Sequence, residues 1–156
     1  MSLSVERIIE MACVELERFI VVSVYRPPNS LYDFFENIME CVLLKLSVSN
    51  KHVFICGDFN INLLENTNAT IRFRTLLKSY NLSNLFSEPT RITSTSATCI
   101  DNIFTNVKPL HKYIINHLSS DHSGQSLSFK IKSVSDVNSS RKLPFVPINI
   151  RRMEKL

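Results

Sequence analysis

Short apolar runs alternate with polar, turn-forming segments along the first sixty residues of the chain. Residues 8–15 and 18–25 have the composition of two strands, and only two residues separate them. So short a connection allows only a tight turn, which predicts an antiparallel hairpin. A further apolar run, His52–Cys56, predicts a short central strand that Gly57 ends. The opening of the chain therefore indicates a sheet.

An amphipathic helix is predicted between the hairpin and the central strand. Ser30 would begin it, with Asp33 three positions later in an arrangement like a capping box. Its apolar residues recur at helical spacing and should form one wide stripe that packs on the sheet. They are Leu31, Phe34, Phe35, Ile38, Met39, Val42, Leu43 and Leu46. We interpret this stripe as core and not as a cofactor pocket.

A second helix is predicted over residues 68–79, with Asn68 or Thr67 as its N-cap and Asn81 as a left-handed residue that ends it. After a segment rich in Ser and Thr, three more strands are predicted. They are Cys99–Thr105, Lys112–His117 and Gln125–Lys132. The order strand, strand, helix, strand, helix, then strands indicates an α/β or α+β domain with its helices on one side of a mixed sheet.

Composition limits the class of protein. The chain has 156 residues, which is the length of one domain or part of a larger one. Hydrophobic residues make up 44% and charged residues 21%, which is typical of a globular protein. Its apolar stretches are far too short to span a bilayer, so membrane insertion is not expected. The N-terminus shows no secretory signal, which predicts an intracellular protein of the nucleus or cytoplasm.

Four cysteines are widely spaced along the chain. They are Cys13, Cys41, Cys56 and Cys99. None forms a CxxC pair, and each lies in an apolar segment, so they are expected to be reduced, buried thiols and not zinc ligands or a disulfide framework. This pattern also favours an intracellular protein.

The charge of the chain is unevenly distributed. The formal net charge is +4 and the pI is about 9.0. Residues 1–17 carry a net charge of −3, whereas residues 130–156 carry +5. A basic excess of this size fits a polyanion partner, but a solvated basic tail explains it equally well.

Polar residues suited to catalysis stand at strand ends or in the loops between strands. Asp58 and Asn60 follow the central strand, Asp101 lies at a later strand, and Asp121 and His122 follow another. Each one alone has a simple explanation, since Asp and Asn are common turn residues. Because the ends of neighbouring strands can converge on one edge of a sheet, these residues can instead form one site. Their combined chemistry fits metal-assisted hydrolysis of a phosphate ester.

Five short sequence blocks support that interpretation. They are VYRPPN at 24–29, ICGDFNI at 55–61, EPTRIT at 88–93, IDNIFTN at 100–106 and LSSDH at 118–122. In their order and spacing, the chain resembles the endonuclease/exonuclease/phosphatase superfamily, and most closely the apurinic-type endonuclease domain of non-LTR retrotransposons. The resemblance implies a partial four-layer αββα sandwich, with two sheets packed face to face.

The resemblance also implies roles for the polar residues. Asp58 would orient and deprotonate the attacking water, and Asn60 would hold the scissile phosphate or that water in line. His122 would bind a phosphate oxygen and stabilise charge in the transition state. Asp101 would fix the tautomer and the orientation of that histidine.

Two further residues and the partners come from the same resemblance. Asp121 would help to hold Mg²⁺ or Mn²⁺, and Tyr25 would place its phenol near the phosphate or the leaving oxygen. Without the resemblance, Tyr25 would be interpreted as an aromatic that covers the end of the core. The implied partner is DNA, and no membrane or small-molecule cofactor is expected.

One part of the family pattern is missing. Family members have, ahead of the position of Tyr25, a strand with an asparagine and a strand that ends in a metal-binding glutamate, and neither is visible here. Residues 1–132 are therefore expected to be the C-terminal part of the domain, and residues 133–156 a polar, basic linker tail.

Three hypotheses follow. The first is an endonuclease that nicks DNA with magnesium and is impaired by this truncation. The second is a non-catalytic retroelement relic that at most binds nucleic acid. The third is a phosphoinositide or sphingolipid phosphodiesterase, which the EPTRIT and IDNIFTN blocks and the tail argue against.

Overall fold

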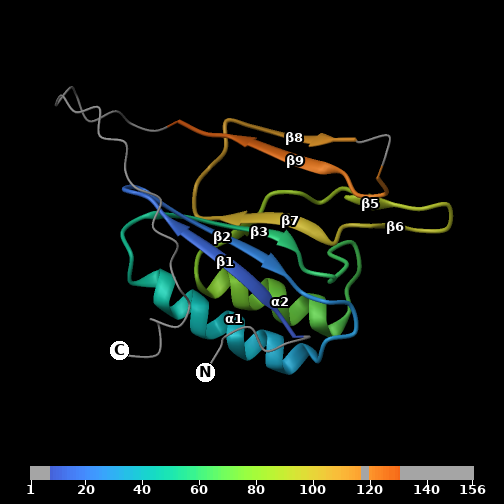
Figure 1. The fold of residues 1–156 in the computed structure, drawn as a ribbon, viewed down its shortest axis with the longest axis horizontal. Coiled ribbons are helices and arrows are strands. Elements are labelled where there is room, and N and C mark those ends of the chain that lie inside the picture. The colour runs from blue at the N-terminus through green and yellow to red at the C-terminus, as the bar shows by residue number, and fades with distance from the viewer. Residues whose placement is uncertain (1–7, 117–119, 131–156) are drawn as a thin grey trace.

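The main sheet has five strands and mixed directions (Figure 1). The computed structural model describes residues 8–116 and 120–130. In spatial order the strands are β1 (Glu10–Glu15), β2 (Phe19–Tyr25), β3 (His52–Asp58), β7 (Asp101–Thr105) and β4 (Ser83–Asn84). Strands β2 and β3 run parallel, and every other neighbouring pair is antiparallel. The sequence-based predictions of the hairpin, the central strand and the mixed sheet are confirmed.

Both helices, α1 (Tyr32–Ser47) and α2 (Asn68–Ser79), cover the same face of this sheet (Figure 1). The core lies between them and the sheet, because side chains from both layers are buried there. The largest come from α1 (Phe35, Met39, Leu43), from α2 (Phe73, Leu77) and from the strands (Val22, Val24, Ile55, Phe104). Phe59, directly after β3, packs against Phe73 and Phe104 with ring centroids 5.4 and 5.0 Å apart. This aromatic cluster fixes where the chain leaves β3.

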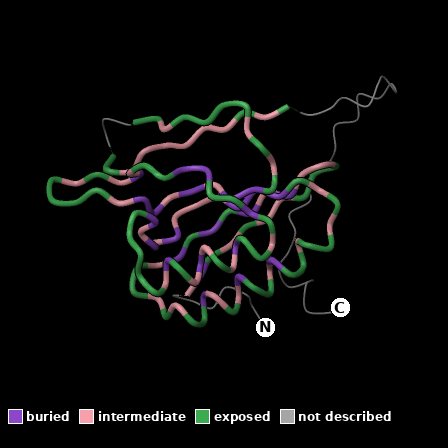
Figure 2. The backbone as a smooth tube through the Cα atoms, turned by 180° about the vertical axis from the view of Figure 1, so that it is seen from behind, coloured by how far each residue is buried: buried purple, intermediate pink, exposed green. Residues whose placement is uncertain are grey.

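The opposite face of the sheet is covered by a second hairpin, β8 (His111–Ile115) and β9 (Gly124–Ser128) (Figure 1). Phe129 attaches it to the sheet, with its ring centroid 4.9 Å from that of Phe54 and 5.4 Å from that of Phe19. A small ribbon of β5 (Arg91–Ile92) and β6 (Ala97–Thr98) lies at the edge. Figure 2 shows the buried backbone concentrated in the main sheet and the inner sides of the helices.

The ends of α2 agree with the sequence. Thr67 is the N-cap, and its side chain accepts a hydrogen bond from the amide of Thr70. Asn81 has a φ of 58°, as expected of a left-handed residue after a helix. The helix itself spans Asn68–Ser79, which confirms its predicted bounds.

The predicted start of α1 is wrong. The N-cap is Leu31, without a side-chain cap, and the helix begins two residues after Ser30. The physical reason is that the Ser30 carbonyl accepts a hydrogen bond from the Arg26 guanidinium, so this residue belongs to the preceding turn. Asp33 caps nothing and forms an ion pair with Arg72 of α2, 2.8 Å away. The predicted stripe is also too wide, because Leu31 and Phe34 are 65% and 56% exposed.

Other expectations need smaller corrections. Cys41 is exposed on α1 and only Cys99 is fully buried, since a helix of this length turns one side to solvent. Gly57 lies within β3, which continues to Asp58. Strands β4, β5 and β6, of two residues each, were not predicted. Parts of the last two predicted strands (117 and 131–132), and the tail at 133–156, lie outside the described residues.

No helix in the described part of the chain is long and apolar enough to cross a lipid bilayer.

Candidate active site

Three of the residues expected in a site lie in one row across the main sheet. Tyr25 on β2 is in register with Asp58 on β3, and Asp58 is in register with Asp101 on β7. Side chains in one such row point to the same face of a sheet. Val24, next to Tyr25, and Phe104, three residues after Asp101, lie on the opposite face and pack in the core with the helices. The row of Tyr25, Asp58 and Asp101 therefore faces the other side, where the β8–β9 hairpin lies.

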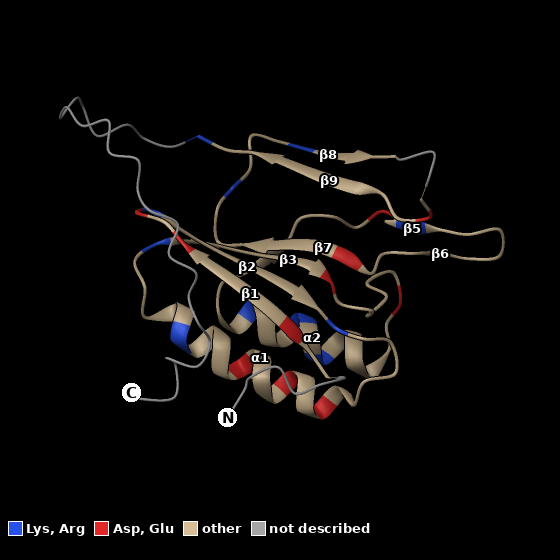
Figure 3. Ribbon diagram, viewed as in Figure 1, with Lys and Arg blue, Asp and Glu red and all other residues tan. Residues whose placement is uncertain are grey.

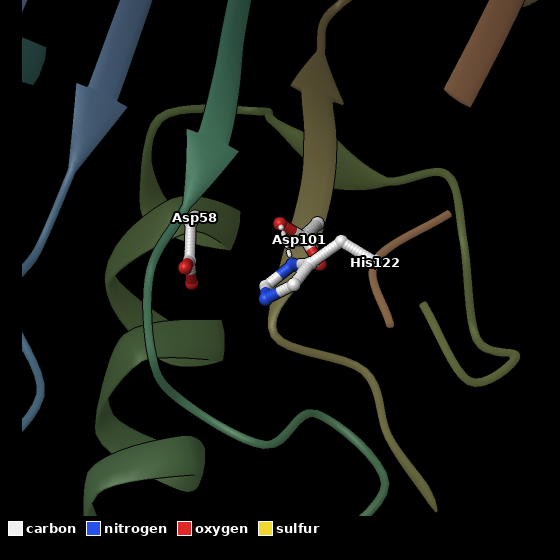
Figure 4. A group of neighbouring side chains, drawn as sticks. All are labelled: Asp58, Asp101 and His122. Atoms are coloured by element: carbon white, nitrogen blue, oxygen red, sulfur yellow. Dashed lines mark hydrogen bonds and ion pairs between the residues drawn. The ribbon is translucent and has the colours of Figure 1, made fainter. Parts of the chain in front are cut away.

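Asp58, Asp101 and His122 form a compact cluster at this edge, with their metal-ligand atoms all within 4.8 Å of one another (Figure 4). The Nδ1 atom of His122 lies 3.0 Å from Oδ2 and 3.2 Å from Oδ1 of Asp101. The contact expected between these two side chains is therefore present. Because a carboxylate can only accept, Nδ1 donates, and the second ring nitrogen points away from Asp101 (Figure 4).

Thr90 holds Asp101 in place, a role that its residue type alone did not predict. It is fully buried, and its hydroxyl donates to Oδ2 of Asp101 over 2.9 Å. The hydroxyl oxygen of Thr90 also accepts hydrogen bonds from the backbone amides of Ile100 and Asp101, at 3.2 and 3.0 Å. Gln125 of β9 donates to the Asp101 carbonyl. The one signal for Thr90 in the sequence was its place in the EPTRIT block.

Replacing Thr90 by Val should destabilise the protein by about 2 kcal/mol, because the amides of Ile100 and Asp101 lose their acceptor and Oδ2 of Asp101 loses one of its two donors, while the side-chain volume stays the same. Thr90→Ser is the matched control, since it keeps the hydroxyl and should cost less than about 1 kcal/mol. Urea denaturation monitored by circular dichroism measures both. Equal midpoints for the two variants would contradict this view of Thr90.

The loop after β3 fixes the carboxylate of Asp58. The amide of Asn60 donates to its Oδ1 atom over 3.0 Å, and Asn60 adopts a left-handed φ of 47°. The Asn60 side-chain amide donates to the carbonyl of Arg26 over 2.7 Å. Asn60 thus lies beside Asp58 as expected, and its amide nitrogen binds the protein backbone.

The environment of Asp58 raises the pKa of its carboxyl group. Burial is the largest cause, because it disfavours the charged form, and the negative charge of Asp101 acts in the same direction. The Asn60 amide, His122 and Arg91 act against the rise. A carboxyl group with a raised pKa is better suited to accept a proton near neutral pH than an ordinary one.

Asp58→Asn should therefore stabilise the fold at neutral pH. A carboxyl group whose pKa is higher in the folded than in the unfolded state binds more protons when folded. The stability of the fold therefore falls as the pH rises from the unfolded pKa through the folded pKa. The asparagine side chain of the variant carries no such charge. The gain in stability of Asp58→Asn over the wild type should therefore grow from acid to neutral pH and then level off. Thermal denaturation across this range measures it. Asp33→Asn, at an exposed carboxyl group on α1, is the control. A gain in stability of Asp58→Asn that did not change with pH would argue against a raised pKa of Asp58.

Asp121 lies next to the cluster, and its side chain contacts Arg91. The Nε atom of Arg91 donates to Oδ2 of Asp121 over 2.7 Å, and this bond lowers the pKa of Asp121. The Asp121 carbonyl accepts from the amide of Ile92, so β5 runs alongside this segment. Figure 3 shows the basic segment of β5 among acidic ones near the ends of β3 and β7. Tyr25 stands at the end of β2 with its side chain half exposed.

The cluster of Asp58, Asp101 and His122 fits a divalent metal ion. Ligand atoms bound to one ion at about 2.0–2.6 Å lie within roughly 5 Å of one another. The separation observed here meets that condition. Two of the three groups are carboxylates, which are the ligands that hard cations prefer.

Sequence comparison assigns the family. The family model described as endonuclease–reverse transcriptase matches residues 19–125, which include every candidate site residue. The chain belongs to the endonuclease–reverse transcriptase family. A search of curated protein sequences finds no significant match.

Solved structures support the same fold. The chain is similar to the endonuclease domain of TRAS1, a telomere-specific non-LTR retrotransposon, with a TM-score of 0.61 and 17% identity over 80% of this chain. It is also similar, with TM-scores of 0.50, to an endonuclease/exonuclease/phosphatase family protein from Leptotrichia buccalis (15% identity, 78% of this chain) and to beta toxin from Staphylococcus aureus (14%, 80%). The chain spans 64%, 54% and 57% of those three structures. The expected α/β fold of the endonuclease/exonuclease/phosphatase type is confirmed.

Proposed function

We propose that this chain carries catalytic residues of a metal-dependent endonuclease that hydrolyses a phosphodiester bond and nicks DNA, as part of a non-LTR retroelement. The observation that supports it most is the cluster of Asp58, Asp101 and His122 at one edge of the sheet. These residues come from three separate parts of the chain, and the family to which the chain belongs is one of endonucleases.

In this proposal Asp58 accepts the proton of the attacking water. Its raised pKa and its fixed orientation, through the Asn60 amide, suit that task. His122 donates from its second ring nitrogen to a phosphate oxygen, where negative charge grows in the transition state. Asp101 holds the ring in the required orientation through the bond to Nδ1, so that both ring nitrogens act as donors.

Asn60, Tyr25 and Asp121 complete the proposed site. Asn60 holds the phosphate or the water in line, and Tyr25 places its phenol near the leaving oxygen, since it lies in the row of Asp58. Asp121 would help to hold the metal beside the cluster, and its bond to Arg91 must then be shared or broken. The metal proposed is Mg²⁺ or Mn²⁺, which would neutralise charge on the phosphate.

We propose further that the 156-residue chain nicks DNA weakly on its own. Within the described residues, no glutamate joins the cluster, whereas magnesium requires a near-octahedral set of oxygen ligands. With DNA as the substrate, the protein would act in the nucleus or the cytoplasm.

A plasmid-nicking assay with magnesium tests the proposal. We expect slow conversion of supercoiled to open-circular DNA, about 100-fold or more slower for Asp58→Ala and for His122→Ala. Arg72→Gln, on the helix face away from the site, is the control for general damage and should nick like the wild type. EDTA should abolish the reaction.

Two results would contradict the proposal. Nicking that survives both substitutions would come from a contaminant or another site. A chain that binds DNA but does not nick it would support a non-catalytic nucleic-acid-binding protein instead.

A further inference from the structure

Arg91 is a cation placed within a group of carboxylates that a substrate phosphate must approach. Its Nε atom donates to Asp121, and its backbone forms an isolated β-bridge with His122. Its charge is close enough to Asp58 and Asp101 to act on both. A phosphodiester carries a negative charge, so three carboxylates at one site would repel it unless a cation offsets them.

Arg91 uses one of its side-chain donors within the protein and has others that a ligand can bind. The guanidinium group has five N–H donors in a rigid fork. The bond to Asp121 uses the one on Nε, and among residues 8–116 and 120–130 no other hydrogen bond is made by this side chain. The two terminal amino groups have the geometry that binds two oxygens of a phosphate. The side chain is also 42% exposed, so a ligand can reach it.

We propose that Arg91 binds a phosphate of the DNA backbone at this site, with Asp121 holding its guanidinium group in place. This inference rests on the proposed function, because it assumes that DNA is the substrate. It gives Arg91 a direct contact with the substrate, and it makes Asp121 the positioning residue for that contact in the metal-free protein.

DNA binding by the full chain in EDTA tests this contact without hydrolysis. Fluorescence anisotropy of a labelled duplex is measured over a series of salt concentrations. Arg91→Gln should weaken binding about tenfold, since it removes charge-assisted bonds, and should reduce the slope of log K against log salt by about one phosphate contact. Arg72→Gln removes an equally charged, ion-paired arginine on the far side and should change affinity less than about twofold.

A double-mutant cycle separates direct contact from charge balance. If Arg91 binds the phosphate, Arg91→Gln still weakens binding in an Asp121→Asn background, although by less, because Asp121 no longer holds the guanidinium group. If Arg91 only neutralises Asp121, that loss disappears there, and the proposal is overturned. Circular dichroism confirms folding, and Arg91→Met, which keeps the apolar stem, replaces Arg91→Gln if the latter does not fold.

The remaining outcomes are also decisive. Binding by Arg91→Gln equal to that by Arg72→Gln would overturn the role of Arg91 and leave the proposed function intact. A wild-type chain without any affinity for DNA would overturn both, and the nicking assay would then fail independently.

Discussion

Replacing Gly57 by Ala is expected to destabilise the protein by more than about 3 kcal/mol. Gly57 has a φ of +146°, a conformation that residues with a Cβ rarely adopt. A Cβ atom built there would lie 1.8 Å from the carbonyl oxygen of Val24, far inside van der Waals contact. That oxygen belongs to the neighbouring strand β2, in the parallel pair at the centre of the sheet.

Rotation of the side chain cannot remove this clash, because the Cβ atom of alanine is fixed by the backbone and the atom it meets is also backbone. Either β2 and β3 separate, or the backbone of β3 rotates and carries Asp58 with it. Since a domain of this size is stable by only about 5–15 kcal/mol, a large part of that margin would be lost. Urea denaturation followed by circular dichroism measures the change.

Ser23→Ala is the matched control for this substitution. Ser23 precedes Val24 on β2 and is exposed, so removing its hydroxyl should change stability by less than about 0.5 kcal/mol. A Gly57→Ala variant as stable as this control would show that the backbone at Gly57 does not adopt the positive φ.

The elements of the fold were largely predictable because they depend on local patterns. The short connection between β1 and β2, three residues in the structure, leaves only a hairpin. The spacing of apolar residues in α2 defines a helix with Thr67 as its cap. The two-residue strands β4, β5 and β6 could not be predicted, since two residues carry no period. Strand β4 exists because β7 offers it a partner, whereas β5 and β6 pair with each other and Arg91 of β5 bridges to His122.

The site was predictable only in part, because some of its contacts join residues that are far apart in the sequence. Asp58, Asp101 and His122 could be named from their residue types and from the resemblance, and the sheet register then brings them together. Thr90 and Arg91 had no assigned roles, because their contacts with Asp101 and Asp121 join residues 11 and 30 positions apart. Only the folded chain shows that the EPTRIT segment runs beside the Asp-His pair.

The predicted start of α1 at Ser30 is wrong because Arg26 binds the Ser30 carbonyl. Arg26 is 7% exposed and donates from Nη1 to the carbonyls of Phe59 and Asn60, at 3.3 and 3.1 Å, and from Nη2 to that of Ser30 at 2.6 Å. Its guanidinium carbon lies 5.3 Å from the centre of the Phe35 ring. One side chain thus joins the end of β2, the start of α1 and the loop that carries Asn60.

Arg26→Lys is accordingly expected to cost about 2–4 kcal/mol, although it keeps the positive charge. A single ammonium group cannot reach three carbonyls that a planar fork serves from two nitrogens, so buried acceptors would lose their donors. Burial already lowers the pKa of Arg26, and a similar lowering would bring the pKa of a lysine closer to neutral pH, because lysine starts from a lower pKa. Denaturation at neutral pH measures the loss.

The loss should extend to the site, because the loop that Arg26 holds also places the Asn60 amide on Asp58. Nicking should therefore fall further than the population of folded protein does, since a misplacement of about 1 Å can cost a hundredfold in rate. Arg72→Lys is the control: it changes an arginine that is 40% exposed and ion-paired on the helices, where exchange should cost less than about 1 kcal/mol. If both variants lose equally little, the guanidinium of Arg26 does not hold this loop, and the position of Asp58 depends on the sheet alone.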